Sequence, residues 1–343
     1  MPALWYYFSM FDVIIIGLGC AGYTAAIYSA RYKLKTLLIG LEEGGMGITA
    51  AEVGNWPGEI EIRGPDLMEK FKKHALSFEE VTQKVARVTK IERLGAGLRP
   101  AHGTAGAAKP AAASGFTLTL QSGEVIEGKT VILATGSAKR HLGVTGEEEF
   151  SGKGVTYCAT CDAFFFKNKN VAVIGGGDSA VEGAAIAAQV AKTVYLVHRR
   201  KEFRAEPYWV EKVKARKNVV MVLENQLKEI HGDAKVKSIT LEKPFNGSNT
   251  LNLDGVFIEV GSNPSTELGK QVGAELDAKG YLKVDAAMKT NIPGFFGAGD
   301  VTNGSHYFAQ FVTAAGEGSI AANSAFNFLS TAGAEGGYMD GGC

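Results

Sequence analysis

The sequence predicts an α/β protein with two domains of the doubly wound type, each built around a parallel sheet. Two observations carry this prediction. An apolar strand, a glycine-rich turn, a helix and a second strand are expected in this order near the start of the chain, and the same order returns in its middle. The length agrees, because 343 residues are more than one ordinary hydrophobic core supports.

The first repeat begins with the apolar strand Val13–Ile16 and continues through a glycine turn into a helix over Thr24–Arg31. A strand over Thr36–Ile39 completes a βαβ unit. The turn contains the three glycines of a dinucleotide fingerprint, which are Gly17, Gly19 and Gly22. Such glycines permit a tight turn, close approach of a pyrophosphate and close helix–strand packing. The helix N-terminus then presents free N–H groups to the phosphates.

A glycine turn between strand and helix also arises for packing alone, but here the complete strand–turn–helix–strand order favours dinucleotide binding. In such folds an acidic residue at the end of the second strand holds the ribose. This chain has Gly40 at that position, so we expect Glu42 or Glu43 to take the role.

The second repeat consists of a strand over Val171–Ile174, a helix ending near Ala188 and a strand over Val194–Val197. Its turn has the GxGxxA form of the fingerprint, with Gly175, Gly177 and Ala180. The two turns are far apart in sequence, which is expected of two Rossmann-like dinucleotide-binding domains rather than two halves of one sheet.

The residues after the second repeat are basic where an NAD-binding domain has a carboxylate. They are His198, Arg199, Arg200 and Arg204. Guanidinium groups bind phosphate oxygens in a forked geometry, so this cluster favours the 2′-phosphate of NADP. The alternative is a solvated basic face on the following helix.

A third glycine segment, Gly297–Asp300, lies near the end of the chain and precedes a helix expected from Thr313. Small residues let the backbone approach a ligand, and the Asp300 carboxylate can accept hydrogen bonds from sugar hydroxyls. Together with the two fingerprints, this segment predicts FAD in the first site and NADPH in the second.

The cysteines are Cys20, Cys158, Cys161 and Cys343, too few for a secreted disulfide scaffold. Cys158 and Cys161 form a CxxC pair, which favours a redox dithiol over half a zinc site because no second pair at metal-ligand spacing is present. Asp162 is expected to shuttle the thiol proton, or alternatively to cap the next helix. Cys20 is expected to be a small buried side chain and Cys343 an incidental thiol.

The composition argues against several partners. Lys plus Arg and Asp plus Glu both number 36, so no general field favours nucleic acid or a membrane surface. The chain start lacks a signal-peptide pattern, so we expect a cytoplasmic protein. Residues 95–114 and 331–343 are rich in small residues and are expected to be a flexible insertion and a mobile tail.

Several motifs together closely resemble low-molecular-weight thioredoxin reductases, over about residues 10–329. They are CATCD, VAVIGGGDSAVE, VHRRKEFRA, VILATGS, GFFGAGDVT and TAAGEGSIAA. The resemblance implies an FAD domain of residues 10–138 and 258–330, interrupted by an NADPH domain of residues 139–257 that carries the CxxC pair, in a homodimer. It also places Asn55, Pro57, Thr135, Gly136 and Gln310 near the flavin or the domain crossing.

The chain departs from the family pattern at Met46, Ala163 and Ala309, where the family commonly has Gln, Gly and Arg. The resemblance implies that NADPH reduces FAD, that FAD reduces the disulfide through Cys161, and that Cys158 then attacks a thioredoxin-like protein disulfide. The alternatives are a glutaredoxin-like, peroxiredoxin-linked or ferredoxin-linked carrier, a flavin redox sensor without turnover, and a zinc-binding module.

Overall fold

The computed structural model describes residues 10–94 and 115–333. The chain divides into two compact units, of which the first contains residues up to Ser137 and from Pro264, and the second contains Ala138–Asn263. The expected insertion at 95–114 and most of the expected tail lie outside the described residues. Residues 331–333 continue the last helix, so the described chain shows no break at the expected start of the tail.

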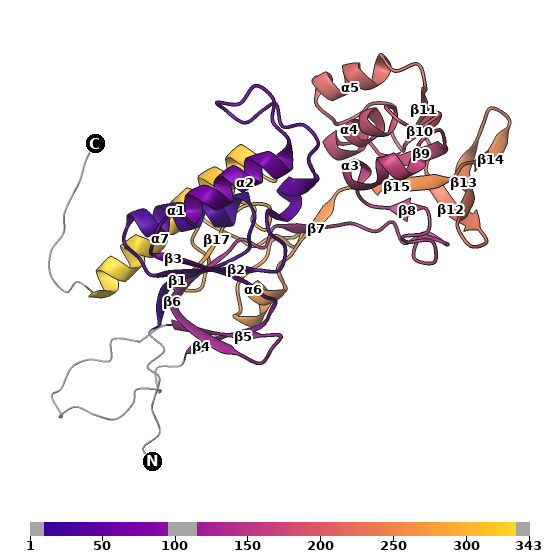
Figure 1. Cartoon of the computed structure of the whole chain (residues 1–343). Helices are drawn as coiled ribbons and strands as arrows, with labels where there is room; N and C mark the ends of the chain where they lie inside the picture. Colours follow the sequence, from indigo (N-terminus) through magenta and orange to yellow (C-terminus); the bar gives the residue numbers. More distant parts are fainter. Residues whose placement is uncertain (1–9, 95–114, 334–343) are drawn as a thin grey trace, which may run out of the picture. The chain divides into compact units, whose positions relative to one another are not determined.

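The first unit is a mixed sheet with helices packed on it (Figure 1). Its strand order is β3-β2-β1-β6-β5-β4, with β17 also paired to β6. The elements of this unit are β1 Phe11–Ile16, α1 Cys20–Arg31, β2 Thr36–Gly40, the 3-10 helix η1 Gly45–Thr49, α2 Gly64–Ala75, β3 Val81–Val85, β4 Val88–Leu94, β5 Gly115–Leu120, β6 Val125–Leu133, α6 Glu267–Gln271, β17 Phe295–Gly297 and α7 Phe311–Gly333.

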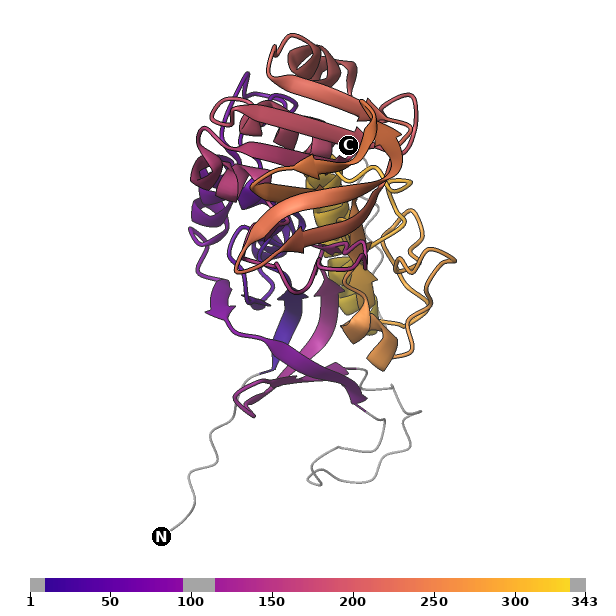
Figure 2. The ribbon, with the colours of Figure 1, turned by 90° about the vertical axis from the view of Figure 1, so that its right-hand side faces the viewer.

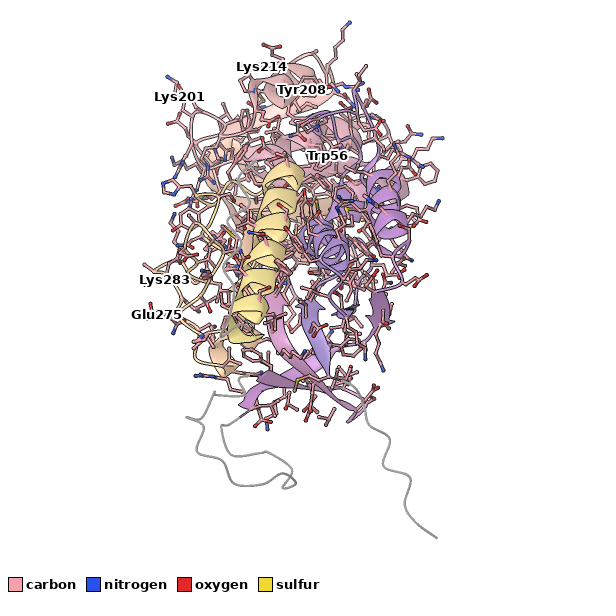
Figure 3. The ribbon with its side chains drawn as sticks, turned by 90° about the vertical axis from the view of Figure 1, so that its left-hand side faces the viewer. Trp56, Lys201, Tyr208, Lys214, Glu275 and Lys283 are labelled. Atoms are coloured by element: carbon pink, nitrogen blue, oxygen red, sulfur yellow. A yellow bond between two sulfur atoms is a disulfide. The ribbon has the colours of Figure 1, made fainter. Side chains whose placement is uncertain are left out.

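Burial explains the order of these elements. The apolar run of β1 has no polar face because Val13, Ile14 and Ile15 are fully buried, as expected for a central parallel strand. Helix α1 packs against α7, and the two backbones approach closely where a Cβ on Gly318 of α7 would lie 2.3 Å from the Ala21 carbonyl oxygen of α1. Figure 3 shows α7 in yellow along this unit, together with the exposed ion pair of Lys283 and Glu275.

The second unit contains a parallel sheet in the order β11-β10-β9-β15-β8 and an antiparallel sheet of β12, β13 and β14 (Figure 2). Its elements are β8 Val155–Thr156, α3 Ala159–Asp162, the 3-10 helix η2 Ala163–Phe166, β9 Asn170–Gly175, α4 Asp178–Ala187, β10 Thr193–His198, α5 Pro207–Lys214, β11 Val219–Leu223, β12 Leu227–Gly232, β13 Val236–Phe245, β14 Ser248–Asn252 and β15 Gly255–Glu259.

The second unit ends later than the sequence suggested. A boundary after residue 257 falls inside β15, which pairs with the central strand β9 along its length. The unit therefore keeps the whole strand and ends at Asn263. The chain enters and leaves it through two short paired strands, β7 Ser137–Lys139 and β16 Ser262–Pro264.

Both glycine turns follow a strand that lies between two parallel neighbours. Strand β1 lies between β2 and β6, and strand β9 lies between β10 and β15. In each sheet the glycine turn follows a strand that has parallel neighbours on both sides. In open α/β sheets, ligands bind in a crevice at the carboxyl ends of such strands, where the strand order reverses. The topology therefore gives each unit one place suited to a nucleotide.

Candidate nucleotide turns and redox site

The glycines of the first turn have different structural roles. Gly17 has a φ of +133°, and a Cβ there would lie 2.0 Å from the Ala134 carbonyl oxygen. A Cβ on Gly22 would lie 1.9 Å from the carbonyl oxygen of Gly17. Gly19 differs, because a Cβ there would meet no atom within 4 Å. Packing therefore requires Gly17 and Gly22, whereas Gly19 faces open space at the start of α1.

The second turn repeats this arrangement. Gly175 has a φ of +151°, and its Cβ would lie 2.2 Å from the Glu259 carbonyl oxygen and 2.6 Å from the Cβ of Ala180. A Cβ on Gly177 would again meet nothing within 4 Å. Both turns thus provide open space before a helix N-terminus, which fits a dinucleotide diphosphate.

The basic cluster lies beside the second turn. His198 ends β10, is buried, and its ring lies where a Cβ on Gly176 would be. Arg199, Arg200 and Arg204 are exposed, and the Arg204 N–H donates to the Gly176 carbonyl oxygen at 2.8 Å. Burial lowers the pKa of His198, and the three arginines lower it further. Because α5 begins only at Pro207, the cluster belongs to the loop and not to the face of that helix.

The segment after β17 contains the partly buried Asp300, and the buried Glu317 of α7 packs against it. Glu317 on α7 accepts hydrogen bonds through Oε2 from the Gly299 N–H at 2.8 Å and from the Thr302 hydroxyl at 2.7 Å. Burial raises the pKa of Asp300 to about 6, and the charge of Glu317 contributes. Glu317 therefore holds the turn that presents Asp300, a role that the sequence did not reveal.

Two residues expected near the flavin lie together although they are far apart in sequence. The Asn55 side-chain amide donates to Gln310 Oε1 at 3.0 Å, and residues 54–60 line a surface hollow. Thr135 donates to the Ser265 carbonyl oxygen at 2.7 Å, and Gly136 has a φ of +63°. These two residues thus form the start of the crossing between the units.

The expected ribose acceptor has another partner in this structure. Glu43 pairs with Lys72, whose Nζ lies 2.9 Å from the carboxylate. This hydrogen bond is the main reason why the pKa of Glu43 is lowered. That Glu42 or Glu43 binds the ribose stays a prediction.

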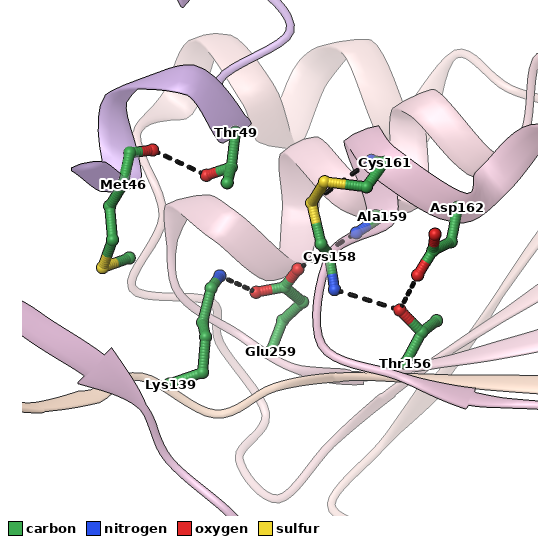
Figure 4. Close-up of a disulfide and its surroundings, with 9 residues drawn as sticks. All are labelled: Met46, Thr49, Lys139, Thr156, Cys158, Ala159, Cys161, Asp162 and Glu259. Atoms are coloured by element: carbon green, nitrogen blue, oxygen red, sulfur yellow. Dashed lines mark hydrogen bonds and ion pairs between the residues drawn. A yellow bond between two sulfur atoms is a disulfide. The ribbon is translucent and has the colours of Figure 1, made fainter. Parts of the chain in front are cut away.

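Cys158 and Cys161 form a disulfide at the start of α3 (Figure 4). Cys158 is the N-cap residue of this helix, and the Cys161 N–H donates to the Cys158 sulfur at 3.2 Å. Asp162 accepts a hydrogen bond from the Thr156 hydroxyl, and Thr156 Oγ1 accepts the Cys158 N–H at 3.3 Å. Asp162 makes no side-chain cap on the following 3-10 helix, so the capping alternative is wrong.

The sequence reading missed two residues beside the disulfide, Lys139 and Glu259. Lys139 Nζ lies 2.6 Å from Glu259 Oε2, and Glu259 Oε1 accepts the Ala159 N–H at 3.3 Å (Figure 4). The available signal was a carboxylate within the otherwise apolar strand β15. Its partners could not be read from the sequence.

Cys343 lies outside the described residues. Cys20 and the three positions that depart from the family pattern are described. Cys20 is buried, its thiol donates to the Phe311 carbonyl oxygen at 3.2 Å, and burial is the main cause that raises its pKa to about 12. Met46 Sδ accepts the Ser137 hydroxyl at 3.4 Å. Ala163 is buried and Ala309 is exposed. Within the described residues, no group of three or more His, Cys, Asp or Glu is placed to hold a metal ion.

Comparisons with known proteins agree with this geometry. The model of the pyridine nucleotide-disulphide oxidoreductases matches residues 11–318. Thioredoxin reductase of Mycolicibacterium smegmatis is 40% identical over 325 residues, covering 93% of this chain and 96% of that one. Glucosaminate ammonia-lyase of Pseudomonas fluorescens is 41% identical over 323 residues, covering 90% and 93%. The crystal structure of Lactococcus lactis thioredoxin reductase aligns with a TM-score of 0.83 at 35% identity, covering 94% and 99%.

Two nucleotide turns and a redox-active CxxC pair define a flavoprotein disulfide oxidoreductase. The chain belongs to the pyridine nucleotide-disulphide oxidoreductase family. Members of the thioredoxin reductase type use FAD and NADPH, as expected for this chain. The resemblance drawn from the motifs and the two-domain α/β fold are confirmed.

Proposed function

We propose that this enzyme reduces the disulfide of a thioredoxin-like protein with electrons from NADPH, with FAD bound in the first unit and NADPH in the second. The observation that carries the proposal is the disulfide between Cys158 and Cys161 in the unit that also holds the second glycine turn. Bound FAD supplies the two-electron relay between the NADPH hydride and this disulfide. In the first unit Gly19 would leave room for the diphosphate, and the Asp300 carboxylate would accept hydrogen bonds from the sugar hydroxyls of the flavin nucleotide.

The two cysteines have distinct roles. The disulfide accepts the electron pair on its Cys161 side, and the S–S bond breaks to leave the Cys158 thiolate. Cys158 then attacks the partner disulfide, and Cys161 displaces the reduced partner from the resulting mixed disulfide. Exposure alone would favour Cys161 as the attacking group, since it is the more exposed. The Cys161 N–H at 3.2 Å instead favours a thiolate on Cys158.

The surface beside the redox pair suits a protein partner. Phe164 and Phe165 follow it in η2 and are 72% and 78% exposed. Neighbouring exposed aromatic side chains are typical of protein contact surfaces. We propose that they contact the thioredoxin-like substrate and that Asp162 moves the thiol proton.

Three further features remain proposals: a homodimer, a cytoplasmic location, and no nucleic-acid or membrane partner. The zero net charge supports the last of these. Within the described part of the chain, no helix combines the length and apolarity needed to cross a bilayer.

A visible spectrum tests the function directly. Purified enzyme should show flavin absorbance that NADPH bleaches, and oxidised thioredoxin should restore it with continuous NADPH consumption. Bleaching that thioredoxin does not reverse, but a glutaredoxin-like or peroxiredoxin-linked protein does, identifies another carrier. Reduction by ferredoxin alone removes the NADPH assignment, and a single bleaching without turnover indicates a sensor. Because one similar protein is a glucosaminate ammonia-lyase, ammonia release from glucosaminate should be measured alongside. No residue described above favours that reaction.

A further inference from the structure

A buried ion pair lies beside the redox disulfide without a role in the reaction described above. Glu259 is the last residue of β15, and its side chain is 4% exposed. Its partner Lys139, on the entry strand β7, is 24% exposed. Burying a carboxylate is unfavourable unless it is paired and hydrogen-bonded, so a pair at this depth costs more than a surface pair.

The second oxygen of Glu259 holds the redox turn. Oε1 accepts the N–H of Ala159, the residue directly after Cys158 (Figure 4). Helix α4 closes the other side, because a Cβ on Gly183 would lie 2.9 Å from the Ala159 Cβ and 3.9 Å from the Glu259 Cγ. The carboxylate is therefore packed between the peptide that follows Cys158 and helix α4.

Glu259 and Lys139 form an ion pair whose two charges oppose one another beside Cys158. Burial raises the pKa of Glu259, and Lys139 opposes this through its charge and hydrogen bond. When the disulfide is reduced, a negative charge forms on the neighbouring Cys158 sulfur. That charge would be stabilised by an uncompensated lysine and opposed by an uncompensated carboxylate.

We propose that Glu259, paired with Lys139, is a positioning residue that fixes the Ala159 peptide and sets the ionisation of the reduced Cys158 thiol. The inference rests on the proposed redox role of Cys158 and Cys161 and adds the residues that tune it. Glu259 does not touch the partner disulfide; it acts through the peptide and charge beside Cys158.

The test compares thiol ionisation in three forms of the holoenzyme reduced with dithiothreitol: wild type, Glu259→Gln, and Glu259→Gln combined with Lys139→Met. The amide keeps an acceptor for the Ala159 N–H but leaves Lys139 without its counter-charge. We expect the pKa of Cys158 to fall by about one unit in Glu259→Gln, from the usual effect of a nearby opposite charge. Removing the lysine as well should return it to within about 0.3 units of wild type. The readout is the pH profile of iodoacetamide alkylation, resolved at Cys158 by peptide mass spectrometry.

The control is Asp254→Asn, which also removes a carboxylate from a lysine pair, here with Lys169, at the other end of β15. It should leave the Cys158 profile unchanged. Asp162 on α3 and Glu182 on α4 are present in every form, so their effects on the pKa of Cys158 drop out of the comparison. If the shift came from damage to the fold, the double variant should depart further from wild type than Glu259→Gln does. If it comes from the unpaired lysine charge, the double variant should return to the wild-type Cys158 profile.

An unshifted Cys158 profile in Glu259→Gln, or a shift that Lys139→Met does not reverse, overturns the inference. If Glu259→Gln fails to fold, Lys139→Met alone should raise the pKa of Cys158, and no change refutes the idea. The proposed function has a separate readout. If NADPH does not reduce the Cys158–Cys161 disulfide of the wild type, the proposed function is wrong. The Cys158 profile of the dithiothreitol-reduced protein still tests the role of Glu259.

Discussion

Replacing Gly19 by alanine separates ligand binding from packing in the first glycine turn. Gly19 has a φ of −96° and a ψ of −170°, which alanine adopts without strain. An added Cβ meets no protein atom within 4 Å. The free energy of unfolding should therefore change by no more than about 1 kcal/mol, because alanine is the poorer N-cap residue but also lowers the conformational entropy of the unfolded chain, and the two effects oppose one another.

Binding of FAD should respond much more strongly. The new methyl group would occupy the space in which a diphosphate approaches the N–H groups of α1. A hydrogen bond to a charged group contributes roughly 1.5–3 kcal/mol. Losing one such bond should weaken FAD binding by roughly ten- to 150-fold.

Two substitutions serve as matched comparisons. Gly22→Ala places its Cβ 1.9 Å from the Gly17 carbonyl oxygen, so it should lower the free energy of unfolding by about 1–3 kcal/mol or more. Gly177→Ala is as open as Gly19→Ala, and it should retain FAD but weaken NADPH. Urea midpoints report folding, and titration of apoprotein followed by flavin fluorescence reports affinity. Wild-type FAD affinity in Gly19→Ala, or a loss of stability equal to that of Gly22→Ala, would refute the reasoning.

Three further predictions follow from the site. Cys158→Ser should leave flavin reduction by NADPH intact, as followed by stopped-flow bleaching, and abolish thioredoxin reduction. Thioredoxin reduction at a near wild-type rate in this variant would contradict the assignment. Arg199→Ala with Arg200→Ala should cost roughly a hundredfold or more in NADPH preference, from two charged hydrogen bonds, while NADH use changes little. An unchanged NADPH/NADH ratio of kcat/KM would remove the 2′-phosphate role. Burial and, second, the charge of Glu317 raise the pKa of Asp300 from 3.8 to about 6. The stability associated with protonated Asp300 is therefore fully present below about pH 4. Up to about 3 kcal/mol of the free energy of unfolding is lost as the pH rises through 6. Asp300→Asn should flatten that slope in urea titrations at pH 4 to 7.

The glycine turns could be located from the sequence because their requirements are local. An apolar strand, a positive φ at Gly17 and close packing at Gly22 all act within a few residues of one another. The start of α1 was placed too late, at Thr24, because the residues from Gly17 to Gly22 were all assigned to the glycine turn. The helix begins at Cys20 because Gly19 already takes the N-cap position.

The environment of the disulfide could not be predicted in the same way. Ala159 and Glu259 meet only because β15 pairs with β9 and brings residues from the end of the unit beneath α3. Lys139 reaches the same carboxylate from the entry strand. Such contacts depend on strand order, which a single sequence does not specify. The partner of Asp162 was missed for a related reason, since Thr156 belongs to the short edge strand β8.

The position of Glu259 also bears on how the second unit can work. Its backbone pairs with Gly175 in the nucleotide turn, while its carboxylate holds the peptide next to Cys158. The nucleotide turn and the redox pair are therefore fixed to the same strand end and cannot easily exchange places within the unit. Both must nevertheless reach the flavin, one to deliver hydride and the other to receive electrons. We infer that the unit turns as one body between the half-reactions, with the dihedral change taken up near Gly136 and Gly261, whose φ values are +63° and +96°.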